Sequence, residues 1–374
     1  MKNMMLRMVT GFVLIFSGLM SSGAWAYEMA GVDIHGFVSQ GFIYSEHFNY
    51  LTNDSKDGSF QYNELGINFG KELTENLRLG IQLFSRDVGD AGNNKITIDW
   101  AYGDYHLRDW LGVRAGRIKL PIGLYNETRD IDMLRTNIIM PQSLYQDLLR
   151  DTVIAANGAG VYGNIDMSGA GSLDYQVVAG QLNIDNDSGF EKYFNHRAWG
   201  LFSVSGDSDS EITFAGSLKW NTPLDGLLLG VSAMRSPLET PISYIMTGHP
   251  LAGTPGRVEA TNRVYTLSME YTWEDLVIAA EWQQFEQDYE AHSDAMGAVV
   301  RAQNDISRGY YIQASYRFTE LFSLGAYYSV FYPDKDDKDG TNNTFKSDAW
   351  EKDYALTMRF DINEYCIFKV EGHY

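Results

Sequence analysis

The chain has 374 residues, a formal net charge of −20 at pH 7 and a single cysteine, Cys366. This acidity argues against nucleic acid as a partner, because neutralising phosphates requires clustered Lys and Arg. One cysteine excludes an internal disulfide. The composition is rich in glycine (36) and tyrosine (24) and poor in proline (8), which suits short strands, tight turns and aromatic belts.

The N-terminus predicts export. Lys2 and Arg7 precede an apolar run at 9–20, and Ala24-Trp25-Ala26 follows it. A positive start, a short apolar core and a small-x-small site form a secretory signal peptide. A helix that spans a membrane needs about 20 apolar residues, so a retained N-terminal anchor is the weaker alternative. We predict a signal peptide over residues 1–26 and one domain over 27–374.

Alternation of apolar and polar residues is the strongest pattern in the rest of the chain. At 77–83, for example, Leu77 and Leu79 alternate with Arg78 and Gly80. The pattern predicts about fifteen strands, at 32–44, 59–71, 77–86, 95–107, 111–119, 156–167, 172–183, 211–221, 227–235, 262–273, 276–286, 308–318, 321–332, 350–361 and 364–374. In a secreted β-sandwich the apolar face would form a core. In a transmembrane barrel it would face lipid, while the polar face lines water.

The predicted connections alternate between short turns and longer polar loops. The long ones fall at 45–58, 87–94, 185–209, 236–261, 288–307 and 333–349. Short turns at one rim and long loops at the other are typical of an outer-membrane barrel. We therefore predict an all-β fold, a transmembrane antiparallel β-barrel. Bacterial single-chain barrels have an even number of strands, so we expect about 16, either with one strand overlooked or with the closing strand lacking. Cys366 then becomes a small lipid-facing residue of the last predicted strand.

A short motif adds a family resemblance. The segment 113–126 holds Gly116-Arg117 on a strand that runs into Pro121 and Gly123. It resembles the sixteen-strand trimeric porins of Gram-negative outer membranes, in the group that includes phosphate-selective porins. The resemblance implies passive diffusion of small polar solutes and ions, a homotrimer, and an outer membrane with its lipid and lipopolysaccharide as surroundings. The acidic balance argues against phosphate selectivity, because an anion filter needs a local excess of Lys and Arg.

The stretch near 119–152 predicts a loop folded into the barrel. Loops beyond about 12–15 residues are uncommon unless they are functional or disordered, and this one carries many apolar residues, including Ile138, Ile139 and Leu148. A disordered loop would not carry so much apolar surface. We expect a packed loop, partly helical between Gln142 and Arg150, that constricts the pore. The alternative is a loop that caps the barrel or joins a trimer interface.

Charged residues on this loop and on the preceding strands are the candidate constriction residues. The basic ones lie at inward positions or at a strand end, and the acidic ones lie on the loop: Arg78, Arg86, Arg114, Arg117, Lys119, Glu127, Asp130 and Asp132. A basic row that faces acidic residues would set a transverse field, which orients dipolar solutes.

Other functions find less support in the sequence. A serine hydrolase needs Ser and His within hydrogen-bond reach, and His35 with Ser39 is the single early candidate. The seven histidines show no metal-ligand spacing, and the acidic run at 334–339 lacks the features of a calcium loop. We expect no enzymatic activity, cofactor or metal. The main alternative is an adhesin or receptor barrel that acts through its extracellular loops.

Overall fold

The computed structural model describes residues 31–52, 54–89, 91–186, 188–197, 201–246, 248–342 and 346–374. The predicted signal peptide, residues 1–26, lies outside the described residues. Within them, no helix is long and apolar enough to cross a membrane.

Strands dominate the described chain, and seventeen of them form one sheet. Their bounds are β1 (Asp33–Gln40), β2 (Tyr62–Thr74), β3 (Leu77–Val88), β4 (Thr97–Arg108), β5 (Leu111–Lys119), β6 (Ala155–Asp166), β7 (Ser172–Gln181), β8 (Phe202–Val204), β9 (Asp209–Ser210), β10 (Thr213–Asn221), β11 (Leu227–Tyr244), β12 (Pro255–Trp273), β13 (Leu276–Ser293), β14 (Ala298–Arg317), β15 (Phe322–Tyr332), β16 (Glu351–Asn363) and β17 (Cys366–His373). The helical elements are α1 (Arg150–Val153), α2 (Gly189–Arg197) and the 3-10 turns η1 (Asp132–Leu134), η2 (Ser168–Ala170) and η3 (Lys346–Ala349). Apart from the short β8 and β9, every strand corresponds to one predicted from the alternation.

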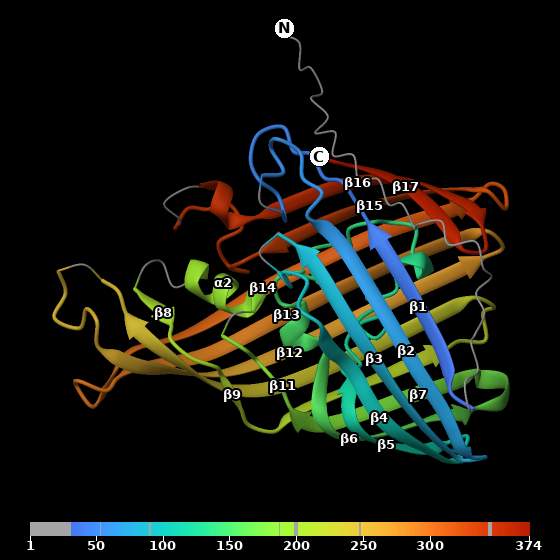
Figure 1. Ribbon diagram of the computed structural model, residues 1–374, viewed down its shortest axis with the longest axis horizontal. Coiled ribbons are helices and arrows are strands. Elements are labelled where there is room, and N and C mark those ends of the chain that lie inside the picture. The colour runs from blue at the N-terminus through green and yellow to red at the C-terminus, as the bar shows by residue number, and fades with distance from the viewer. Residues whose placement is uncertain are drawn as a thin grey trace, which may run out of the picture.

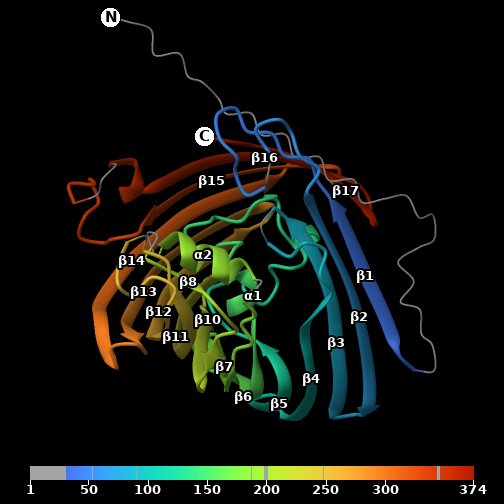
Figure 2. The same cartoon turned by 60° about the vertical axis from the view of Figure 1, so that its left-hand side comes forward.

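Neighbouring strands pair antiparallel in chain order, from β1 to β7, then β7 to β10, and on to β17. The short β8 and β9 pair with the far end of β11. Among the described residues no pairing joins β1 to β17. The long strands curve around the segment between β5 and β6, which Figures 1 and 2 show inside the sheet.

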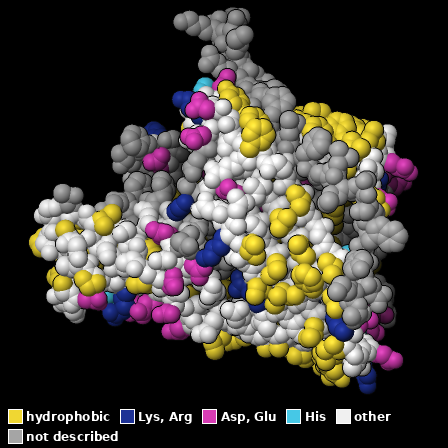
Figure 3. Space-filling model, viewed as in Figure 1, with side chains coloured by type: hydrophobic (Ala, Val, Ile, Leu, Met, Phe, Trp, Pro, Cys, Tyr) yellow, Lys and Arg dark blue, Asp and Glu magenta, His cyan; other side chains and the backbone are white. Residues whose placement is uncertain are grey.

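The two faces of this sheet reverse the usual order of polarity. On β16, Leu356 is 51% exposed whereas its neighbour Thr357 is 1% exposed. The same contrast separates the exposed Leu65 and Ile67 from the buried Glu64 on β2. Figure 3 shows hydrophobic side chains gathered on the outer face of the N-terminal strands. Apolar outside and polar inside is the arrangement of a transmembrane barrel, and the fold is that predicted from the alternation.

Four strands are much longer than predicted. β11 continues to Tyr244, and β12 begins at Pro255, so the predicted loop at 236–261 is wrong over most of its length. The loop at 288–307 is wrong too, because β13 reaches Ser293 and β14 begins at Ala298. In these extensions charged and polar residues replace the apolar ones on the outer face, so the alternation disappears although the backbone pairing continues. Figure 1 shows β11–β14 projecting beyond the other strands.

The helical part of the loop between β5 and β6 is also displaced from its prediction. Residues 142–149 form turns and bends, and α1 begins only at Arg150. Within this stretch the side chain of Gln142 bonds back to the main-chain oxygen of Met140 at 2.9 Å and to the Asp147 carboxylate at 2.9 Å. Such local side-chain bonds compete with helical ones, which explains why the predicted helix does not form at Gln142.

Candidate functional site

The chain between β5 and β6, residues 120–154, is here called the inner segment. It contacts strands that are distant in sequence. The Leu124 amide donates to Glu281 Oε1 of β13 at 2.8 Å, and the amides of Ile138 and Ile139 donate to the two oxygens of Glu371 on β17, each at 2.8 Å. The inner segment is therefore held against the inner face of the sheet from two directions (Figure 2).

Glu281 is the centre of the first attachment. Its carboxylate is only 3% exposed. Besides the Leu124 amide, it accepts hydrogen bonds from Ser268 Oγ at 2.5 Å, from the Tyr311 hydroxyl at 2.7 Å and from the Tyr145 hydroxyl. A buried carboxylate is tolerated when its oxygens are this fully hydrogen-bonded. The bond from Tyr145 ties the inner segment to the wall through a side chain as well as through the backbone.

The second attachment is on β17 and uses both signs of charge. Lys369 is fully buried, and its Nζ donates to Asp132 Oδ2 at 2.9 Å and to the main-chain oxygens of Asp132 and Arg135 at 2.8 and 2.9 Å. Glu371 accepts from the Thr357 hydroxyl in addition to the two amides, and His373 Nε2 lies 3.0 Å from it. The Lys369 ammonium thus binds oxygens of Asp132 and Arg135, and the Glu371 carboxylate binds the amides of Ile138 and Ile139.

The third attachment joins the inner segment to β3, β4 and β5. Lys119 Nζ lies 2.5 Å from Asp130 Oδ1 and 3.5 Å from Asp99 Oδ2, and it donates to the Glu127 main-chain oxygen at 2.8 Å. Gln82 of β3 donates to the other oxygen of Asp130 at 2.5 Å. Burial raises the pKa of Asp130, but the charges of Lys119 and Arg150, together with the hydrogen bonds from Lys119 and Gln82, hold this pKa below its usual range.

Two arginines complete this third attachment. Arg86 of β3 donates to the Asp147 main-chain oxygen at 2.7 Å and lies 3.3 Å from Asp151 Oδ2. Arg150 lies 2.8 Å from Asp99 Oδ1 and 3.2 Å from Asp151 Oδ1. Burial raises the pKa of Asp151. The guanidinium groups of Arg86 and Arg150 together lower it by more than burial raises it, so that the pKa is about 2. Opposite charges are therefore interleaved around the start of α1.

The predicted constriction residues do not lie together in one site. Arg86, Lys119 and Asp130 meet in the third attachment, which Glu127 joins through its main-chain oxygen. Asp132 lies in the second attachment, with Lys369. Arg117 donates to the Asp99 main-chain oxygen at 3.2 Å.

Arg114 and Arg78 lie apart from these attachments. Arg114 pairs with Asp104 at 3.1 Å, and its guanidinium lies 4.1 Å from the ring centre of Tyr162. Arg78 is exposed near the turn that connects β2 and β3. The charges of Arg86 and Lys119 are thus paired directly with carboxylates of the inner segment.

The wall residues Glu281, Lys369 and Glu371 were not predicted from the sequence. A signal for them was present, because each is a charged residue at an inward position of a predicted strand. Lys369 and Glu371 alternate with Phe368 and Val370, and Glu281 lies next to Trp282. Without the register between distant strands, nothing in the sequence connects these charges with the inner segment.

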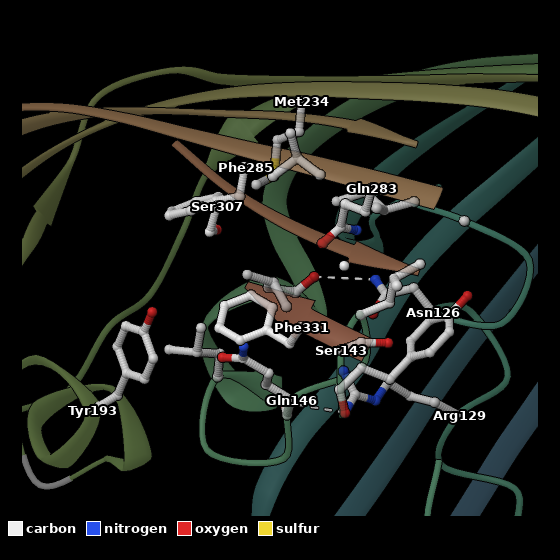
Figure 4. Close-up of a pocket in the computed structure, with 18 residues that line it drawn as sticks. Asn126, Arg129, Ser143, Gln146, Tyr193, Met234, Gln283, Phe285, Ser307 and Phe331 are labelled. Atoms are coloured by element: carbon white, nitrogen blue, oxygen red, sulfur yellow. Dashed lines mark hydrogen bonds between the residues drawn. The ribbon is translucent and has the colours of Figure 1, made fainter. Parts of the chain in front are cut away.

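Three cavities lie beside the inner segment on the inner side of β11–β17. One of about 90 Å³ lies between it and these strands (Figure 4), with Met234, Phe285 and Phe331 in its lining. A second, of about 380 Å³, includes Tyr125 and Gln313, and it shares Arg129 with the first. A third, of about 870 Å³, lies at the rim of short turns and shares four lining residues with the second: Leu134, Thr136, Val277 and Ser315.

The acidic run and the His35–Ser39 pair both lie in the described part of the chain. No group of three or more His, Cys, Asp and Glu side chains is placed there to hold a metal ion. In the acidic run, Asp337 instead accepts hydrogen bonds from the amides of Thr341 and Asn342 at 2.8 and 3.0 Å. On β1, His35 is exposed whereas Ser39 is buried.

Comparison with known proteins places the fold. No family model matches the chain. An uncharacterized protein of Aquifex aeolicus is 27% identical over 166 residues, which is 41% of this chain and 34% of that relative. The match thus spans about a third of the relative's length.

Solved structures cover nearly the whole chain. The outer membrane channel DcaP of Acinetobacter baumannii matches with a TM-score of 0.50 at 11% identity, over 96% of this chain and 99% of that one. Salmonella typhi OmpF, solved with daunomycin, gives a TM-score of 0.49 at 12% identity, over 92% and 97% of the two chains. An anion-selective porin from Comamonas acidovorans gives 0.43 at 13% identity, over 98% of each. The likeness to DcaP shows that this chain has the β-barrel fold of outer-membrane porins.

Proposed function

We propose that this protein is a porin of the Gram-negative outer membrane that lets small polar or charged solutes diffuse passively through its barrel. The observation that carries the proposal is the reversed polarity of the sheet, with exposed Leu356 outside and buried Thr357 inside. A water-filled interior requires polar side chains, and a lipid-facing exterior requires apolar ones. Outer-membrane lipid and lipopolysaccharide are then its surroundings.

The inner segment is proposed as the constriction. Its attachments to β13, β17 and β3–β5 support this role, because a segment held from several sides narrows the lumen at a fixed place. Arg78, Arg86, Arg114, Arg117, Lys119, Glu127, Asp130 and Asp132 remain the proposed constriction residues. A homotrimer is proposed from the resemblance of segment 113–126 to trimeric porins.

An adhesin or receptor role is the second candidate. The observation that favours it is the projection of β11–β14, whose tip between β13 and β14 carries the exposed Met296 and Val299. Such a projection offers a surface to a partner outside the cell. An adhesin needs no open passage, so absence of conduction in the folded protein would favour this role over the channel.

The test is the reversal potential of the refolded protein in a planar bilayer under a KCl gradient. We expect stepwise conductance with a weak preference for cations. The cavity at the turn rim is lined by five carboxylates, from Glu274, Asp275, Glu320, Asp361 and Glu364, against the guanidinium groups of Arg317 and Arg359. An acidic entrance concentrates cations. Folded protein without conductance would contradict the channel and favour the adhesin, and anion selectivity would mean that the basic residues govern passage.

A further inference from the structure

The cavity of about 90 Å³ differs from the rest of the interior in its chemistry. The charged side chains around it are paired in the three attachments, whereas the walls of the cavity itself are mainly apolar. We infer that this cavity is a binding site for one ring-sized, uncharged group of a solute that crosses the barrel. The inference rests on the proposed channel function and names the class of solute that the channel would favour.

Apolar side chains from several adjacent strands form the wall side of the site. Met234 of β11, Phe285 of β13 and Phe331 of β15 line it, and Tyr193 of α2 lies across from them (Figure 4). Met234 is 6% exposed and packs in an apolar cluster with Val264. Aromatic and thioether side chains bind the faces and edges of rings favourably, so this wall suits a planar apolar group.

Amide oxygens form the polar side. The side-chain nitrogen of Asn126 donates to the main-chain oxygens of Leu120 and Val153 at 2.9 and 3.1 Å. The side-chain nitrogen of Gln283 donates to Thr266 Oγ1 at 3.2 Å. Among the described residues no hydrogen bond uses the carbonyl oxygen of either side chain, and Figure 4 shows the Gln283 amide directed into the cavity. A ligand that carries an N–H or O–H group therefore has acceptors here.

The same surroundings disfavour a charged ligand. Arg129 is the one ionisable group with a full charge in the described lining, and its guanidinium donates to the main-chain oxygens of Tyr145 and Gln146 at 2.9 and 3.3 Å. Asp147 lies 3.7 Å from it and offsets the charge. An anion would compete with these partners, and an ammonium would exchange its hydration for amide oxygens alone. Burial of a charge without a paired partner is costly.

The size of the cavity sets the size of the group. An apolar protein cavity of about 150 Å³ holds a benzene molecule. The present cavity, of about 90 Å³, is smaller and has the inner segment as one of its walls, so it takes up part of a single ring and leaves the substituent outside. Benzamide, with one ring and a neutral amide, is the appropriate probe. Benzoate and benzylammonium match it in size and differ in charge.

The experiment records single-channel current with each probe on the wild-type protein, the Phe285→Ala variant and the Phe214→Ala variant. Phe214 lies on β10 and is 52% exposed on the outer face, so it is the matched control. We expect benzamide to interrupt the current for longer than benzoate or benzylammonium does. Phe285→Ala should shorten the interruptions about two- to tenfold, as the loss of one aromatic contact predicts. Phe214→Ala should leave them unchanged.

A second variant and a second measurement keep the two proposals separate. Gln283→Glu places a carboxylate in the cavity and should reverse the preference from benzamide to benzylammonium. Binding of benzamide to protein in detergent micelles, measured by saturation-transfer NMR, does not depend on conduction. Conduction without benzamide binding would overturn the site and leave the channel intact. Binding without conduction would support the site and overturn the channel. Equal effects of the three probes, or of the two Phe variants, would also overturn the site.

Discussion

Single carboxylates on the wall determine where the inner segment lies. Glu281 and Glu371 each gather backbone amides and hydroxyls of residues that are far away in sequence. A carboxylate can do this because it offers several acceptor sites without needing a donor of its own. Hydrogen bonds to a charged group are also stronger than neutral ones. Glu281 and Glu371 therefore fix the position of the inner segment at two places along its length.

Glu281→Gln should loosen the inner segment without removing β13. The amide offers one acceptor oxygen in place of two, which leaves at least one of the buried donors from Tyr145, Tyr311 and Leu124 without a partner. An unsatisfied buried donor costs about 1–3 kcal/mol. We expect lower thermal stability in detergent and faster proteolytic cleavage within 120–154. Glu259→Gln, at a side chain that is 47% exposed, is the control; equal loss in both variants would contradict the attachment.

Asp151 should make the third attachment sensitive to acid. Its pKa in the folded protein is lowered to about 2 by Arg86 and Arg150, against about 3.9 for a free Asp side chain. The ionised group therefore stabilises the fold fully above about pH 4, and this contribution is lost as the pH falls through about 2. The Asp151→Asn variant should unfold at lower temperature than wild type at pH 7, with the difference disappearing near pH 2.

The control for this pH series is Asp225→Asn, at an exposed residue of the turn between β10 and β11. It should unfold as wild type does at every pH. A difference between Asp151→Asn and wild type that stays constant from pH 7 to pH 2 would show that charge pairing is not its source.

At the scale of elements, β14 and β15 are shaped to receive the inner segment. A Cβ added at Gly309 would clash with the Ser143 main-chain oxygen, and one at Gly325 would lie 2.8 Å from Thr136. Next to these glycines, Ser329 Oγ and Ser143 Oγ are 2.8 Å apart. Close backbone approach is what a glycine in a strand permits. The glycines thus form notches along which the segment lies.

Gly309→Ala should displace the inner segment from β14. The added methyl group meets a backbone atom rather than a flexible side chain, so overpacking should cost about 1–3 kcal/mol. Single-channel conductance should change together with thermal stability, because the displaced segment lines the proposed passage. Gly372→Ala on β17 is a matched control, since nothing lies within 4 Å of its added Cβ. Similar behaviour of the two variants would argue against the notch.

The elements differ in how far the sequence predicts them. Strands with an apolar outer face were predicted correctly, because alternation such as Leu77-Arg78-Leu79 indicates a strand with one apolar and one polar face. The extensions of β11–β14 were missed, since their polar and charged outer face was read as loop. Within the β11–β12 ladder, Pro237 lies opposite Thr261 and Pro241 opposite Arg257. In the candidate site, Lys119 and Asp130 were predicted because they lie close together in the sequence. Glu281 on β13 and Lys369 and Glu371 on β17 were not, because their contact with the inner segment depends on the register of distant strands.

At the scale of the whole molecule, charge is distributed unevenly along the proposed passage. The attachments around the inner segment pair their charges, whereas the cavity at the turn rim has five carboxylates and two guanidinium groups. One of the latter, Arg359, lies 2.7 Å from Asp361. Selectivity among ions should therefore arise mainly at this rim.

Replacing Glu274, Glu320 and Glu364 together by Gln should weaken the preference for cations. The exposed rim carboxylates act through the local cation concentration, so the effect should fade at high salt, where the Debye length is about 3 Å at 1 M. Reversal potentials at low and high KCl measure it. The control changes Glu259 and Glu290 to Gln on the outer face of β12 and β13, and an equal shift in this control would place selectivity elsewhere.

The attachments to β13 and β17 also constrain the order in which the barrel is assembled. The inner segment belongs to the first half of the chain, but the acceptors for its amides are supplied by Glu281 and Glu371 in the second half. These amides can form their native hydrogen bonds only when β13 and β17 are in place. A one-residue slip of β17 would turn Glu371 toward lipid. The contacts of the inner segment with Glu281 and Glu371 therefore require β13 and β17 in their native register.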